Sequence, residues 1–78
     1  MATKAYILVE TTVGRNREII AALKKVQGIS SVELITGPYD LIVVVEADSL
    51  VGVGDIVTTH IHPVPGIIRT VTCLVMSS

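Results

Sequence analysis

The chain has 78 residues, of which 50% are hydrophobic and 17% charged, and its net charge is −1 at neutral pH. This length predicts a single domain over residues 1–78, marginally stable alone because small domains bury a modest share of their surface. One cysteine excludes an internal disulfide, and the charge balance argues against direct nucleic-acid binding, which normally requires a basic patch. The apolar runs fall short of the ~20 residues that cross a bilayer, so no membrane partner is expected.

The first half of the chain is predicted to form a strand, a helix and a second strand. Residues 5–11 are rich in β-formers. Residues 15–26 carry apolar side chains at spacings of three and four, the pattern of an amphipathic helix. Gly28 suits the left-handed conformation that often ends a helix, and residues 29–36 follow as the next strand.

A β-hairpin is predicted at the middle of the chain, where Gly37-Pro38-Tyr39-Asp40 separates two extended runs. Gly37 can adopt a positive φ, Pro38 presets φ at about −65°, and Asp40 can accept hydrogen bonds from nearby backbone amides. The strand after this turn covers residues 41–46.

The second half repeats the pattern of the first. Asp48 or Ser49 is expected to cap a helix, Pro63 and Pro65 to prevent its continuation, and residues 67–76 to form the last strand. The apolar positions of this helix are Leu50, Val53, Val57 and Ile61.

Helix crossovers join parallel strands with a right-handed turn, and each crossover leaves a gap that another strand fills. The order of elements therefore predicts an α+β fold of the ferredoxin-like βαββαβ type, a four-stranded antiparallel sheet with two helices on one face. Both sheet faces are apolar, since Leu41, Val43 and Val45 alternate with Ile42 and Val44. The helices cover one face, so we expect the other to pack against a second copy as a homodimer.

The histidines and the cysteine are not expected to form a metal or reactive site. His60 and His62 do not share a helix face, so a solvated helix end is expected. Cys73 lies in the middle of the last strand and is expected to be an inert core residue. No set of nucleophile, base and orienting residue is evident, and no cofactor is expected.

Three motifs make the chain resemble the C-terminal effector-binding domain of the Lrp/AsnC transcription regulators. They are Gly28-Ile29 after the first helix, TGPYD at residues 36–40 and PGIIRTVT at residues 65–72. The resemblance implies a dimeric α/β barrel of facing sheets, assembly into tetramers or octamers, and an amino-acid site between dimers. Full-length members carry an N-terminal helix-turn-helix domain, whereas four residues precede the first predicted strand here. The chain therefore resembles the stand-alone modules, which have no DNA-binding domain.

The candidate ligand-binding residues lie in the hairpin turn and the last strand. Asp40 supplies an acid for the ammonium of an amino acid, and Gly37 leaves backbone accessible. Tyr39 offers a ring and a phenol, and Thr70 and Thr72 place two hydroxyls on one strand face. Taken alone, the residue pattern leaves open that Asp40 only locks its turn and that the threonines are ordinary strand formers. The resemblance favours the hairpin residues more than the threonines.

These observations predict a stand-alone amino-acid-sensing and oligomerisation module of transcription regulation, which could join full-length regulators. No signal peptide precedes the first strand, so a cytoplasmic location is expected. The alternative is an enzyme, because dimeric α/β barrels include cofactor-free monooxygenases; the absence of Trp and Phe argues against it. A purely structural oligomer without a ligand also stays open.

Overall fold

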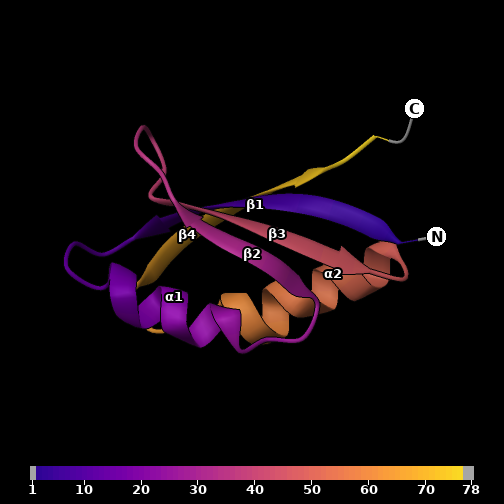
Figure 1. Cartoon of the computed structure of the whole chain (residues 1–78), viewed down its shortest axis with the longest axis horizontal. Helices are drawn as coiled ribbons and strands as arrows, with labels where there is room; N and C mark the ends of the chain where they lie inside the picture. The colour runs from indigo at the N-terminus through magenta and orange to yellow at the C-terminus, as the bar shows by residue number, and fades with distance from the viewer. Residues whose placement is uncertain (1, 77–78) are drawn as a thin grey trace.

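A computed structural model describes residues 2–76. The elements are β1 (Thr3–Thr11), α1 (Asn16–Lys24), β2 (Ile29–Leu34), β3 (Leu41–Ala47), α2 (Leu50–Ile56), η1 (Val57–Ile61, a π-helix) and β4 (Ile67–Leu74). The four strands form one antiparallel sheet in the order β2-β3-β1-β4, and the helices lie against one face (Figure 1). This arrangement confirms the predicted ferredoxin-like fold. Within the described residues, no helix is both long and apolar enough to span a membrane.

The connection between β2 and β3 is longer than the predicted tight turn. β2 ends at Leu34, before the predicted boundary, so the loop covers residues 35–40. The Ile35 N–H closes this loop by donating to the Asp40 carbonyl oxygen at 2.8 Å. Gly37 has a φ of +130°, which agrees with the predicted need for glycine in the turn. Because the loop is longer, its last residues, Tyr39 and Asp40, lie close to β4 and β1.

The core lies between the helices and one face of the sheet. Ile19 and Leu23 of α1 are fully buried, as the helical spacing predicts. Leu50, predicted to belong to the second apolar stripe, is 59% exposed, so that stripe begins at Val53. The buried residues alternate along β1 and β3, and one residue of β2 joins them; the buried apolar strand residues are Ala5, Ile7, Val9, Val32, Leu41, Val43 and Val45.

The second helix changes its winding halfway along, which sets the position of His62. The Ser49 side chain caps α2 by accepting a hydrogen bond from the Gly52 N–H at 3.1 Å, as predicted. η1 is wound as a π-helix, and the His62 N–H donates to the carbonyl oxygen of Val57, five residues earlier. This winding keeps Ile61 in the core and leaves His62 exposed at the helix end, within reach of β4.

Gly28 is required by a close approach as well as by its conformation. Its φ is +98°, and a Cβ there would lie 2.6 Å from Ile56 Cδ1 and 3.3 Å from the Glu46 carbonyl oxygen. We expect Gly28→Ala to lower the free energy of unfolding by about 2–3 kcal/mol, because the positive φ and the contact both oppose a side chain.

Gly14→Ala is the matched control for this substitution. Gly14 has a φ of +87° but nothing within 4 Å of its Cβ position, so only the backbone strain of about 1–2 kcal/mol is expected. Urea unfolding of both variants measures the difference. Equal losses of stability would show that the contact with Ile56 adds no cost.

The face of the sheet opposite the helices is apolar, and no helix of residues 2–76 covers it (Figure 1). Cross-strand pairing places Tyr6 opposite both Val44 and Cys73 on this open face. Cys73 was expected in the core, but it is exposed here, because the helices cover the other face. The apolar residues of the open face are Leu8, Ile42, Val44 and Val71, with Tyr6 and Cys73 between them.

Candidate functional site

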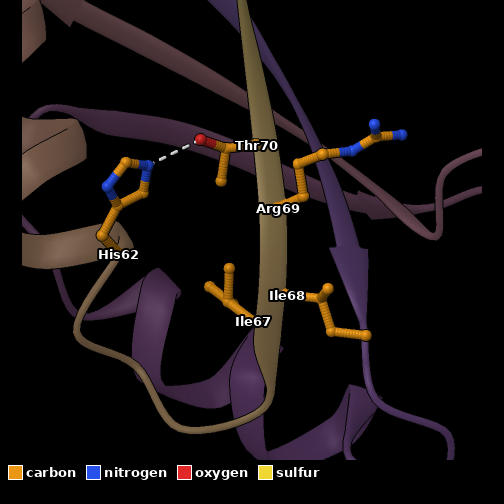
Figure 2. A pocket seen from close by; sticks show the side chains of 5 residues that line it. All are labelled: His62, Ile67, Ile68, Arg69 and Thr70. Atoms are coloured by element: carbon orange, nitrogen blue, oxygen red, sulfur yellow. Dashed lines mark hydrogen bonds between the residues drawn. The ribbon is translucent and has the colours of Figure 1, made fainter.

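A pocket lies beside the start of β4, at the edge of the sheet (Figure 2). Its volume is about 300 Å³, which is enough for a small molecule. Among residues 2–76, β4 pairs with β1 and with no other strand, so its outer side is a free edge of the described sheet. The lining residues are His62, Ile67, Ile68, Arg69 and Thr70.

A β-bulge explains why four consecutive residues of β4 line one pocket. The register with β1 shifts here, so that Ile68 is an extra residue with no opposite neighbour. Strict alternation would point neighbouring side chains to opposite faces. Instead, Ile67 and Thr70 point toward the side of His62, and Ile68 and Arg69 both point the other way (Figure 2). The pocket therefore receives groups from both sides of the strand.

His62 and Thr70 are joined across this pocket, where Nε2 of the imidazole lies 2.7 Å from Oγ1 of the hydroxyl (Figure 2). Of the two threonines predicted to bind ligand, Thr70 lines the pocket. Thr72 lies two residues further along the strand, exposed and outside the lining. Residues 2–76 contain no cluster of three or more His, Cys, Asp or Glu side chains placed to hold a metal ion.

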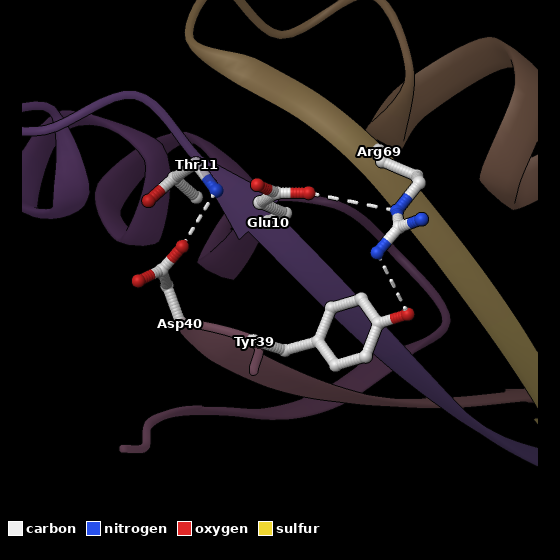
Figure 3. A network of polar contacts seen from close by, with 5 residues as sticks. All are labelled: Glu10, Thr11, Tyr39, Asp40 and Arg69. Atoms are coloured by element: carbon white, nitrogen blue, oxygen red, sulfur yellow. Dashed lines mark hydrogen bonds and ion pairs between the residues drawn. The ribbon is translucent and has the colours of Figure 1, made fainter. Parts of the chain in front are cut away.

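Tyr39 and Asp40 leave the hairpin loop to contact other strands (Figure 3). The Asp40 carboxylate accepts a hydrogen bond from the Thr11 N–H at 2.8 Å, so it fastens the loop to the end of β1 rather than to amides of its own turn. The Tyr39 hydroxyl accepts a hydrogen bond from Arg69 Nη2 at 3.3 Å, and the guanidinium lies 5.4 Å from the ring centroid. Gly37 is exposed in the same loop, with nothing within 4 Å of its Cβ position.

The predicted site residues thus fall into two groups, three in the hairpin loop and two on β4. Arg69 links the groups, since it lines the pocket and also contacts Tyr39. The Glu10 carboxylate lies 3.5 Å from Arg69 Nε in a solvent-exposed ion pair. Sequence reasoning missed Arg69, Glu10 and His62 as site residues. The position of Arg69 beside Thr70 in the PGIIRTVT segment could have indicated it, whereas the contact of His62 depends on the π-helical winding.

Comparison with known proteins identifies the family. The family model of the Lrp/AsnC ligand binding domain matches residues 4–78. No curated protein sequence matches the chain significantly. Among solved structures, FFRP-DM1 is 32% identical, with a TM-score of 0.89 over 95% of this chain and 99% of that chain. The protein TTHA0845 from Thermus thermophilus is 28% identical, with a TM-score of 0.92 over 97% of this chain and 95% of that chain.

A third structure is that of the transcriptional regulator NMB0573 from Neisseria meningitidis in complex with L-Met. It is 18% identical with a TM-score of 0.85, and the alignment covers 96% of this chain but 50% of that regulator. This likeness concerns the fold of one part of a longer protein. The family match spans nearly the whole chain and agrees with the motifs at the hairpin and the last strand. The chain therefore belongs to the Lrp/AsnC ligand binding domain family, as a regulatory domain rather than an enzyme.

Proposed function

We propose that this chain is an amino-acid-sensing module of transcription regulation, with its ligand bound where the hairpin loop meets β1 and β4. The position of Asp40 carries the proposal. This partly exposed carboxylate accepts one backbone N–H, that of Thr11, through Oδ2. A carboxylate has two acceptor oxygens, so Oδ1 remains to accept from the ammonium of an amino acid.

The other predicted residues complement this acid. Tyr39 supplies a ring beside the loop, Gly37 leaves the loop backbone open, and Thr70 and Thr72 supply hydroxyls on β4. The family is described as a ligand-binding domain, and a regulator containing the same fold has been crystallised with L-Met. Both observations support a small effector. The Asp40 carboxylate, together with the exposed loop backbone and the threonine hydroxyls, supports an amino acid as that effector.

The open sheet face supports assembly of the module. A chain of 78 residues gains much stability by covering such a face, and a second copy is the simplest cover. We infer a dimer of facing sheets closed into a dimeric α/β barrel, with dimers joining into tetramers or octamers around the ligand. Residues 1–78 form one domain that acts in the cytoplasm through assembly, including assembly with full-length regulators, and its net charge of −1 fits a module that does not contact DNA itself.

Asp40→Asn tests the site. We expect amino-acid affinity to fall about ten- to a hundredfold, because a charge-assisted hydrogen bond contributes about 1.5–3 kcal/mol. Asparagine keeps an oxygen that can accept from the Thr11 N–H, so the unfolding midpoint and the dimer should be unchanged. A thermal-shift screen of the common amino acids selects the ligand, because a ligand specific for the native state raises its stability. Calorimetric titration then measures the affinity.

Asp55→Asn is the matched control, because it removes the same charge from an exposed position on α2. Its affinity should equal that of the wild-type protein. If Asp40→Asn also bound equally well, Asp40 would lie outside the site. If that variant lost the dimer instead, the role of Asp40 would be structural.

A further inference from the structure

The outer edge of β4 presents backbone groups that have no partner in β1. The Val75 N–H donates to the Lys4 carbonyl oxygen, which makes these two residues a hydrogen-bonded pair of the ladder between β1 and β4. Such pairs recur every second residue along antiparallel strands. The alternate residues of β4 therefore direct their N–H and carbonyl groups away from β1, and these residues are Thr70, Thr72 and Leu74.

The hydrogen bonds of β1 on its other side agree with this alternation. The Val9 carbonyl oxygen accepts from the Asp40 N–H, so the backbone of Val9 is directed toward the hairpin and β3. Val9 lies opposite Thr70 in the register and is turned away from it. Among residues 2–76, no other strand lies beside β4, so these N–H and carbonyl groups are left for a partner outside the chain.

The β4 edge lacks the features that usually protect such edges. Sheet edges are commonly protected by charged side chains, proline, bulges or short length. The segment TVTCL at residues 70–74 contains no charge and no proline, and the bulge of β4 lies before it, at Ile68. The opposite edge strand, β2, carries the exposed Glu33 and a register shift between Ile29 and Ser31. Of the two sheet edges, β4 is therefore the one open to strand pairing.

The hydrogen-bonding pattern of this edge is complementary to itself. Its outward-facing residues are spaced two apart and centred on Thr72. When a second copy of β4 lies antiparallel, with a twofold axis at Thr72, that residue forms a hydrogen-bonded pair with its counterpart. Thr70 then forms such a pair with Leu74 of the second copy. Every outward-facing N–H and carbonyl group of residues 70–74 is thereby paired.

The side chains that this pairing brings together are also compatible. Thr72 meets its own counterpart, and threonines opposite one another in a sheet interact favourably. Val71 lies opposite Cys73 of the second copy. Arg69, the nearest charged residue, lies opposite Val75, so no like charges meet. A second copy therefore fits this edge in both its hydrogen bonds and its side chains.

We propose that β4 joins face-to-face dimers into larger assemblies, by pairing antiparallel with β4 of another dimer around a twofold axis at Thr72. The inference rests on the proposed dimer of facing sheets and identifies the second contact of the assembly. A twofold axis perpendicular to the sheet keeps the helices of both copies on one side. The two open faces then form one continuous apolar surface, with Val71 and Cys73 at the junction.

The edge contact acts between dimers rather than between single protomers. It pairs a few residues of each strand, which is much less surface than the about 800 Å² that each partner of a stable interface buries. A face-to-face dimer carries two β4 edges, and two weak contacts that form together hold an assembly far better than one. The open face therefore forms the dimer first, and the β4 edges extend it.

The test places charges at the centre of the pair. We expect sedimentation velocity without added amino acid to show wild-type assemblies larger than a dimer at high protein concentration. Thr72→Lys and Thr72→Glu each set like charges opposite one another, so each should raise the dissociation constant between dimers at least about fivefold. An equimolar mixture of the two variants sets opposite charges together and should restore the larger assemblies. A role of Thr72 in folding or in ligand binding would not produce this rescue.

Leu34→Lys and Leu34→Glu are the matched controls. Leu34 is exposed on β2, the other edge strand, and lies beside the buried Leu41 on the side of the helices. Thr72 also lies on that side, opposite the buried Ile7. The controls should assemble as the wild-type protein does, and all four variants should keep the face-to-face dimer. Failure of the Thr72 mixture to assemble better than either variant alone would overturn this inference.

A disulfide trap tests the register without adding a charge. Thr72→Cys in a Cys73→Ser background sets two thiols opposite one another, where the Cα atoms of paired residues lie about 5.5 Å apart, within the range that a disulfide spans. Oxidation with diamide should give a covalent dimer. Leu34→Cys in the same background should not. Equal cross-linking of the two variants would contradict pairing of the β4 edges.

The outcomes separate this inference from the proposed function. If Asp40→Asn weakens amino-acid binding while Thr72→Lys assembles as the wild-type protein does, edge pairing is wrong and amino-acid sensing stands. A wild-type protein that remains a dimer at millimolar concentration would also exclude edge pairing. If the Thr72 variants behave as expected but no amino acid binds, the contact between dimers stands and the sensing proposal fails.

Discussion

Val43→Asp is expected to abolish cooperative folding at micromolar protein concentration. Val43 is fully buried in the middle of β3, opposite Ile7, on the face that the helices cover. An unpaired carboxylate at such a position costs about 4 kcal/mol or more. A chain of this length has a total stability of only about 4–12 kcal/mol. Circular dichroism during thermal unfolding should show a lost or strongly lowered transition.

Val51→Asp is the matched control for this result. Val51 is 73% exposed in the first turn of α2, where an acid also interacts favourably with the helix dipole. The same substitution should therefore leave the unfolding midpoint unchanged or slightly raised. A wild-type midpoint for Val43→Asp would contradict the burial of this side chain.

Val44→Asp, one residue further along β3, is expected to prevent dimerisation. Val44 lies on the open face, opposite Tyr6 of β1 and Ser31 of β2. In a twofold dimer of facing sheets, each protomer would bury one carboxylate without a partner. At about 2 kcal/mol for each carboxylate, the dimer would weaken roughly a thousandfold. Sedimentation velocity over a range of concentrations measures this change, again with Val51→Asp as the control.

The two valine variants distinguish the two faces of one strand. Val43→Asp should be unfolded or strongly destabilised at every protein concentration, because the core of each protomer is damaged. Val44→Asp should instead show a stability that no longer rises with protein concentration, because assembly no longer contributes to it. A Val44→Asp dimer as tight as the wild-type dimer would exclude the open face as the dimer interface.

Local sequence signals were sufficient to predict the helices and strands and the fold class. The spacing of Ile19 and Leu23 predicts the buried side of α1, Gly28 adopts the expected positive φ, and Ser49 caps α2 as expected. These features depend on a few neighbouring residues, so short-range propensity and periodicity determine them. The order of the elements then leaves few topologies, because crossovers are right-handed and strands fill the gaps between parallel neighbours.

The residues of the candidate site were only partly predictable. The TGPYD and PGIIRTVT segments indicated Asp40 and Thr70, and the structure places both near the end of the sheet where the hairpin meets β1 and β4. The acceptor role of Asp40 was expected within its own turn, but its partner is the Thr11 N–H, 29 residues away in the sequence. Such a partner depends on the register of β1 against β3, which no local pattern encodes.

The pocket beside β4 depends on two departures from regular geometry. The π-helical winding of η1 brings His62 to Thr70. The bulge at Ile68 places the side chains of Ile68 and Arg69 on the same side of β4, where strict alternation would separate them (Figure 2). Cys73 shows a similar limit of sequence patterns. The alternation of side chains correctly places Cys73 on the same sheet face as Val71, but it does not indicate which face the helices cover. Periodicity describes regular elements, whereas a shifted register or a widened turn follows from the packing of whole elements against one another.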